Sequence, residues 1–148
     1  MSQRRPQART PLAPATSAVL AALALGVAAG VAWLLAVLLM RHPASGLALP
    51  VGLLLGLAVG LTTHGPRYWR AAMAALATLV AIMVSGLGFI ALLIAGNMGM
   101  GVLETLRAAG PGMLWQLLRL GTSPLDVLWY TLGIAMAAGF ASRGSRAN

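Results

Sequence analysis

Apolar residues gather in four long runs along the chain, and short polar stretches separate them. The first run covers residues 17–40, which as an α-helix would be about 36 Å long and exceeds the roughly 30 Å hydrocarbon core of a bilayer. The other runs cover residues 46–63, 69–95 and 124–141. The pattern predicts an all-α fold, namely a polytopic membrane four-helix bundle.

Residues 99–121, between the third and fourth runs, have a mixed pattern rather than a fifth run. Leu103 and Leu106 can face lipid, while Glu104 and Arg107 lie three residues apart and can pair. Gly110-Pro111-Gly112 then interrupts the pattern, because proline and glycine break a continuous helix. We therefore expect one or two amphipathic helices lying in the membrane interface between the third and fourth spans.

The two ends of the chain are polar. Residues 1–16 hold three arginines and several prolines and cannot bury apolar area, which predicts a flexible basic N-terminal tail. Residues 17–142 form the expected four-span membrane domain, and residues 143–148 form a short C-terminal tail.

Composition supports the membrane prediction. Apolar residues make up 59% of the 148 residues and charged residues only 8%, whereas a soluble domain has about 25% charged residues. The formal net charge is +8, but the arginines lie singly or in small groups between apolar runs. This distribution is typical of membrane-helix flanks and disfavours nucleic acid as a partner. Cysteine is absent, which excludes disulfides and thiolate chemistry.

The arginines also predict an orientation. With the N-terminus inside, seven arginines lie on the cytoplasmic side and three, namely Arg41, Arg107 and Arg119, on the other. The positive-inside rule then favours cytoplasmic N- and C-termini. Abundant alanine, glycine and arginine without lysine is typical of a GC-rich bacterial genome, so we expect a multi-pass protein of the bacterial cytoplasmic (inner) membrane.

Small residues recur at intervals of four in the spans. The second span has Gly52, Gly56 and Gly60, and the first has Gly26 and Gly30. In lipid, helices associate through close backbone approach, so these stripes are candidate helix-packing seams. A row of Gly133, Ala137 and Ala141 in the fourth span is similar. The glycine face of the second span is also a candidate surface for homo-oligomerisation.

Candidate chemistry centres on Asp126, the acid nearest to a span. Ser123 and Asp126 have the spacing of a helix N-terminal capping box, in which the carboxylate satisfies amides at the helix end. An ion pair between Asp126 and Arg41, or ion and proton handling by Asp126, are the alternatives. His42 and His64 lie at opposite ends of the second span and cannot share a metal. We predict no catalytic residues, no metal site and no cofactor.

Aromatic residues fall near the expected membrane surfaces. Tyr68 and Trp69, between Arg67 and Arg70, predict an anchor at one interface. The opposite interface has a second group that resembles an aromatic belt, comprising Trp33, Trp115, Trp129 and Tyr130.

Two segments carry a family resemblance. Residues 123–130, Ser-Pro-Leu-Asp-Val-Leu-Trp-Tyr, resemble the closing segment of uncharacterised bacterial four-helix inner-membrane modules. The glycine-rich stretch from Leu49 to Gly60 is similar to their glycine-rich helix. The resemblance implies the four-span layout and carries no activity.

These patterns favour a non-enzymatic accessory, assembly or interaction component of the membrane. Its expected partners are the lipid bilayer and either another membrane protein or further copies of the chain. The alternative is a small transporter or oligomeric channel subunit, which normally needs polar or ionisable groups inside the bundle.

Overall fold

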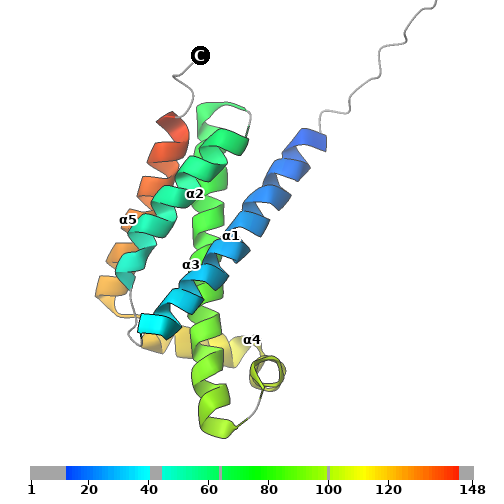
Figure 1. The fold of residues 1–148 in the computed structure, drawn as a ribbon, viewed down its shortest axis with the longest axis vertical. Coiled ribbons are helices and arrows are strands. Elements are labelled where there is room, and N and C mark those ends of the chain that lie inside the picture. Colours follow the sequence, from blue (N-terminus) through cyan, green and yellow to red (C-terminus); the bar gives the residue numbers. More distant parts are fainter. Residues whose placement is uncertain (1–12, 41–44, 64, 100, 144–148) are drawn as a thin grey trace, which may run out of the picture.

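The computed structural model describes residues 13–40, 45–63, 65–99 and 101–143, and this part is all α-helical (Figure 1). It contains five α-helices and not the four of a four-helix bundle; α4 lies in the segment between the third and fourth runs, where one or two amphipathic helices were expected. The bounds are α1 Ala13–Met40, α2 Ala48–Thr62, α3 Arg67–Met98, α4 Val102–Gly121 and α5 Pro124–Arg143, with a 3₁₀ turn at Ser45–Leu47 before α2.

Three of the helices are long and apolar enough to cross a membrane: α1 from Thr16, α3 and α5. They suggest a membrane-embedded protein. Helix α2 is equally apolar but has 15 residues. Helix α1 begins at Ala13, so the last part of the predicted N-terminal tail is helical. Arg41, His42 and His64 lie outside the described residues.

The helices alternate in direction, with α4 as the exception. Helices α1 and α3 run one way, α2 and α5 run the other, and α4 crosses the end where α5 begins (Figure 1). The end of the bundle that holds the start of α3 and the end of α5 is called the arginine end here, because Arg67, Arg70 and Arg143 lie in those turns. The opposite end is called the α4 end.

Glycines with positive φ shape the α4 end. Gly99 ends α3 in the left-handed conformation, with φ of 66°, and its N–H donates to the carbonyl of Ala95. Gly110 has φ of 68° and ψ of 162°, which is not helical and divides α4 into two halves just before Pro111. Residues other than glycine rarely adopt a positive φ of this kind. The divided α4 has the form expected from its Gly-Pro-Gly sequence.

Small residues bring α2 and α5 into backbone contact. A Cβ built on Gly56 would lie 2.6 Å from the carbonyl oxygen of Ala137, and one built on Gly133 would lie 2.6 Å from that of Ala48. A Cβ built on Gly60 would lie 3.3 Å from the Cα atom of Ala141. The glycine stripe of α2 and the small-residue row of α5 therefore form one seam.

A second seam joins α1 to α3. A Cβ on Gly26 would lie 2.5 Å from the carbonyl oxygen of Ala77, and one on Gly30 would lie 2.8 Å from that of Ala81. Both alanines are fully buried. The glycines of α1 thus pack against α3 and those of α2 against α5. Helices α3 and α5 also contact each other, which joins the two seams.

Helix α3 is the longest of the described helices, with 32 residues against 28 in α1, 20 in α5 and 15 in α2. Its 32 residues give a length of about 48 Å, against about 30 Å for the 20 residues of α5. Figure 1 shows the last turns of α3 continuing past the ends of α1, α2 and α5, with α4 lying across them. The α4 end is thus built on an extension of a single helix.

Candidate functional site

A cavity of about 560 Å³ lies between α1, α3, α4 and α5, near the α4 end. This volume is within the range of small-molecule sites, roughly 300–1,000 Å³. Its walls are mostly apolar and carry a few polar groups. The lining residues are Trp33, Val37, Ser85, Gly86, Phe89, Ile90, Leu93, Ile94, Leu117, Leu118, Leu120, Gly121, Thr122, Asp126 and Tyr130. We call this space the α4-end pocket.

Trp33 and Tyr130 form one side of the pocket. Their rings pack edge to face, with centroids 6.2 Å apart and planes at 71°, a geometry that aromatic pairs favour. Trp33 is only 5% exposed, so its predicted place in an aromatic belt is wrong. It packs inside the bundle, whereas Trp115 on α4 is exposed as a belt residue would be.

Asp126 lies at the polar side of the pocket and also caps α5. Its Oδ2 atom accepts a hydrogen bond from the backbone N–H of Ser123 at 2.8 Å. In return, the Ser123 hydroxyl oxygen accepts one from the backbone N–H of Asp126 at 3.2 Å. This reciprocal pair is a capping box, which holds the carboxylate at the start of the helix. Since Arg41 is outside the described residues, its pairing with Asp126 stays a prediction.

The second half of α4 closes the pocket against α3. Leu118 fits over Gly86, where an added Cβ would lie 2.8 Å from the Leu118 Cδ1 atom. The Thr122 hydroxyl donates to the Leu118 carbonyl at 2.6 Å, which tightens the last turn of α4. On the other side, Gly88 receives Leu34 of α1, with an added Cβ at 2.6 Å from its Cδ2 atom. Glycines of α3 thus admit leucines from both neighbouring helices.

Hydroxyl groups along the helices bond to their own backbone. Thr78 donates to the carbonyl of Ala74 at 2.9 Å, and Ser85 donates to that of Ile82 at 3.1 Å. Thr131 donates to the carbonyls of its preceding turn. Such bonds satisfy a hydroxyl within its helix. Ser85 therefore contributes a bonded hydroxyl to the pocket wall.

Arg70 occupies the opposite, arginine end of the bundle. Sequence reasoning placed it beside Arg67 as a headgroup anchor, and Arg67 is indeed exposed, but Arg70 is only 5% exposed. Its Nη1 atom donates to the Gly60 carbonyl at 3.5 Å, in the last turn of α2. The Nε and Nη2 atoms are buried and have no hydrogen-bond partner within the described part of the chain. Its positive charge complements the negative end of the α2 dipole.

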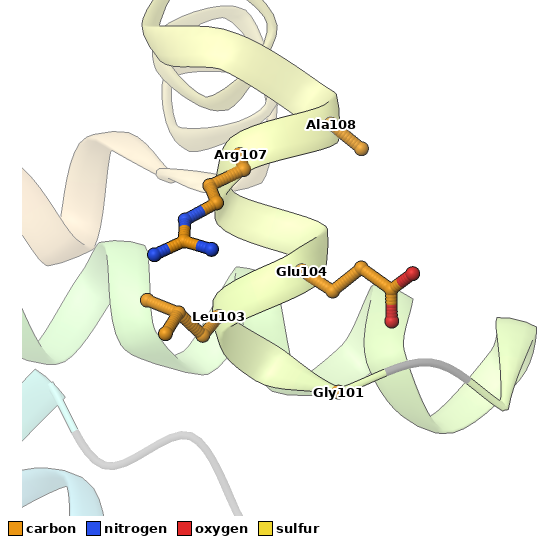
Figure 2. A pocket seen from close by; sticks show the side chains of 5 residues that line it. All are labelled: Gly101, Leu103, Glu104, Arg107 and Ala108. Atoms are coloured by element: carbon orange, nitrogen blue, oxygen red, sulfur yellow. The ribbon is translucent and has the colours of Figure 1, made fainter.

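A shallow hollow runs along the first half of α4, with a volume of about 690 Å³. Figure 2 shows the side chains of Arg107 and Leu103 on one side of the helix and those of Glu104 and Ala108 on the other. The expected pairing of Glu104 with Arg107 is therefore absent from this part of the described chain. The hollow brings no set of polar side chains together.

Comparison of the chain with known protein families, curated proteins and solved structures identifies no relative. No family model, curated protein or solved structure matches the chain.

Sequence reasoning singled out Asp126 but missed the rest of the pocket. One signal was present: Tyr130 follows Asp126 by four residues, which puts both on the same face of a helix. The contributions of Trp33, Ser85 and Leu118 come from three other helices, and no spacing in the sequence relates them. The candidate seam glycines Gly26, Gly30, Gly52, Gly56 and Gly60 are not among the pocket-lining residues.

Proposed function

We propose that this chain is an integral membrane protein of the bacterial cytoplasmic membrane and acts as a non-enzymatic interaction component. Its outer surface supports the membrane location, because large apolar side chains are exposed along the helices. In water such a surface would favour aggregation. The exposed residues include Leu20, Val27, Val31 and Leu35 on α1, Leu54, Leu57 and Leu61 on α2, and Leu125, Leu128 and Leu132 on α5.

A fourth crossing by α2 completes the proposed layout. The 15 residues of α2 give about 22 Å, and the preceding three-residue 3₁₀ turn adds about 6 Å. The sum approaches the roughly 30 Å of a hydrocarbon core. A short span is also compatible with thinning of the bilayer around it. Its close seam with α5, which is long enough to cross, supports the same placement.

The orientation follows from the arginines. Arg67, Arg70 and Arg143 share the arginine end, and Arg107 and Arg119 share the α4 end with both acids of the chain. The predicted layout adds the arginines of the two tails to the arginine end and Arg41 to the α4 end, and the resulting seven against three favour the arginine end as cytoplasmic. Both termini then lie in the cytoplasm, and α4 lies at the opposite surface.

The observation that carries the proposed interaction role is the extension of α3 with α4 across it. If α5 matches the bilayer, α3 continues about 18 Å further and holds α4 at or above the membrane surface. The side chains that α4 exposes are large and apolar, with charged residues between them. They include Leu103, Met113, Trp115 and Leu120. We call these four residues the α4 platform, and its composition suits a protein contact at the membrane surface.

A transporter or channel is less well supported. Transport through a helix bundle needs polar side chains that line a path for the substrate or ion. The hydroxyls of Thr78, Ser85 and Thr131 are bonded to carbonyls of their own helices. The seams that join the described helices are formed by glycine and alanine backbones in direct contact. These features favour a packed, non-conducting bundle.

Site-specific photo-crosslinking tests the interaction role. A photoreactive amino acid replaces Trp115 or Met113 on the α4 platform, and Leu35 or Leu54 serves as the matched control because both are exposed along proposed spans. We expect one discrete crosslinked protein band from each platform position and lipid adducts alone from the controls. The same bands from all four positions, or none from the platform, would contradict the proposed role. A band at twice the mass of the chain would identify the partner as a second copy.

A further inference from the structure

Three aromatic rings from three different helices line the α4-end pocket. Trp33 comes from α1, Phe89 from α3 and Tyr130 from α5. The rings of Trp33 and Tyr130 already pack edge to face, and a further aromatic ring gains from the same edge-to-face or offset geometry. The other walls are mainly aliphatic, and a pocket of this kind takes a compact, largely apolar ligand. Its walls therefore favour a ligand built on an aromatic ring.

The two aliphatic hydroxyl groups among the pocket-lining residues are available to a ligand only as hydrogen-bond acceptors. Thr122 donates its hydroxyl hydrogen to the Leu118 carbonyl, and Ser85 donates its own to the Ile82 carbonyl. A hydroxyl group has one hydrogen and two acceptor lone pairs. Because both hydrogens are already used, each oxygen can accept a further bond but cannot donate one. A ligand that forms a hydrogen bond with either group must therefore supply the donor.

We propose that the α4-end pocket binds a neutral aromatic alcohol, a molecule of the phenol or naphthol type, whose hydroxyl group donates to the Thr122 hydroxyl oxygen. A neutral ligand suits the pocket because apolar walls would remove the hydration of a charged one. Asp126 is engaged in its capping box and has a further interaction, so the proposed contact does not involve its carboxylate. The inference goes beyond the interaction role of the α4 platform and does not depend on it.

The pocket opens to its surroundings beside the end of α4. Leu120 and Gly121 line it and are nonetheless exposed, whereas Trp33 and Ser85 are buried. Thr122 directly follows the exposed pair in the chain, so a ligand that enters with its ring first places its hydroxyl group beside Thr122. Because α5 contributes to the pocket from its beginning, the proposed layout puts the opening at the membrane–water interface, where aromatic amphiphiles accumulate. Moving the ring from this hydrated region to apolar walls is favourable.

Two probe ligands and one variant test the hydrogen bond. β-Naphthol and its methyl ether share the aromatic ring, but only β-naphthol has a hydroxyl group to donate. Their dissociation constants follow from the rise in melting temperature that each causes in the purified full chain in mild detergent. Thr122→Val keeps the shape of the side chain and removes its oxygen. We expect Thr122→Val to weaken binding of β-naphthol about two- to tenfold, as loss of one hydrogen bond predicts, and to leave binding of the methyl ether unchanged. Equal effects on both ligands would overturn the assignment of Thr122 as the acceptor.

A third probe tests the preference for an aromatic ring. β-Decalol is the fully hydrogenated analogue of β-naphthol, so it keeps the hydroxyl group and the two fused rings without their aromatic character. Phe89→Leu removes one of the three rings that line the pocket. We expect Phe89→Leu to weaken binding of β-naphthol about two- to tenfold more than binding of β-decalol, as loss of one aromatic pair predicts. Equal weakening of both would overturn the aromatic preference.

Variants that fill the pocket show whether the ligands bind there. Ile90→Phe occupies part of the space, and Leu93→Phe does so from a more exposed position in the same wall. We expect both to reduce the rise in melting temperature caused by β-naphthol, and Leu35→Phe, at an exposed position of α1 outside the pocket, to retain it. Unchanged far-ultraviolet circular dichroism confirms that each variant is folded.

Partition of a ligand into the micelle affects every variant alike, so only the difference between the parent and the filled variants reports on the pocket. The same rise in the parent, Ile90→Phe and Leu93→Phe would refute binding in the α4-end pocket. Since the assay uses detergent solution and no partner protein, that result would leave the proposed membrane location and interaction role standing. Crosslinking from the α4 platform tests those separately.

Discussion

Gly52 of α2 lies so close to Gly133 of α5 that a Cβ added to Gly52 would overlap the Gly133 carbonyl group. Gly133 in turn faces Ala48, four residues before Gly52 in α2, since a Cβ on Gly133 would crowd the backbone of Ala48. Lipid is as apolar as leucine, so helices in a bilayer are held together by packing and close backbone approach. This glycine pair shows how α2, the shortest of the apolar helices, is fixed to α5.

The α2–α5 seam predicts that a large side chain at Gly56 strongly destabilises the protein. A Cβ there would lie 2.6 Å from the Ala137 carbonyl oxygen, and the remaining atoms of a leucine have no space. We expect Gly56→Leu to lower the free energy of unfolding by about 3 kcal/mol, the upper end for overpacking. Thermal unfolding in mild detergent measures it. Ala135→Leu is the matched control on the exposed face of α5 and should change stability by less than about 0.5 kcal/mol. Equal losses would contradict the seam.

The α1–α3 seam makes a parallel prediction on α1. Gly30 faces the Ala81 carbonyl oxygen and Val84, whereas Ala28 is exposed two residues away. Gly30→Leu should separate α1 from α3, which are otherwise joined along the same face at Gly26. We expect rapid proteolysis in detergent for Gly30→Leu and wild-type resistance for Ala28→Leu. If both variants resist alike, Gly30 is not a close-packing position.

The amino-acid sequence predicted the helices better than their arrangement. Four apolar runs correctly marked α1, α2, α3 and α5, because length and hydropathy alone identify such segments. The start of the second run forms a 3₁₀ turn, so α2 is shorter than its run. The divided α4 followed from turn chemistry, since Gly110 adopts a conformation that favours glycine.

Burial was harder to predict, for a physical reason. Lipid-facing and core-facing positions are both apolar, so a membrane helix such as α1 has no amphipathic pattern that marks its inner face. Trp33 was therefore placed at the surface although it packs inside against Tyr130. Arg70 was expected among headgroups for a different reason, because an arginine at the start of a membrane helix usually lies at the interface. The α4-end pocket depends on contacts among four helices, which no local spacing encodes.

The capping box at the start of α5 predicts a modest loss of stability on substitution of Ser123. Ser123→Ala removes the oxygen that accepts the Asp126 N–H, and loss of such a cap costs about 0.5–2 kcal/mol. Equilibrium unfolding of the purified protein measures the change. Thr131→Ala is a suitable control, because its hydroxyl bonds within the helix. A Ser123→Ala variant as stable as the control would show that the cap contributes nothing measurable.

Buried Arg70 predicts an unusual result. Its guanidinium is desolvated, with Nε and Nη2 unpartnered within the described chain and a long bond from Nη1 to Gly60. Replacing a poorly compensated buried ion with an apolar side chain of similar length is often neutral or stabilising. We expect the melting temperature of Arg70→Met to equal or exceed that of the parent. Arg67→Met, at an exposed position, provides the reference. A clear destabilisation by Arg70→Met alone would indicate that the charge holds the arginine end together.

Thiol labelling at the two ends of α2 tests most directly whether the chain crosses the membrane four times. The parent chain has no cysteine, so Gly46→Cys and Thr62→Cys each introduce a single thiol at an exposed residue beside or within α2. A membrane-impermeant maleimide is added to intact bacterial spheroplasts that express either variant. The proposed layout predicts labelling of Gly46→Cys in intact spheroplasts and of Thr62→Cys only after permeabilisation. Labelling of both thiols from the same side would contradict a crossing by α2 and the four-span layout with it.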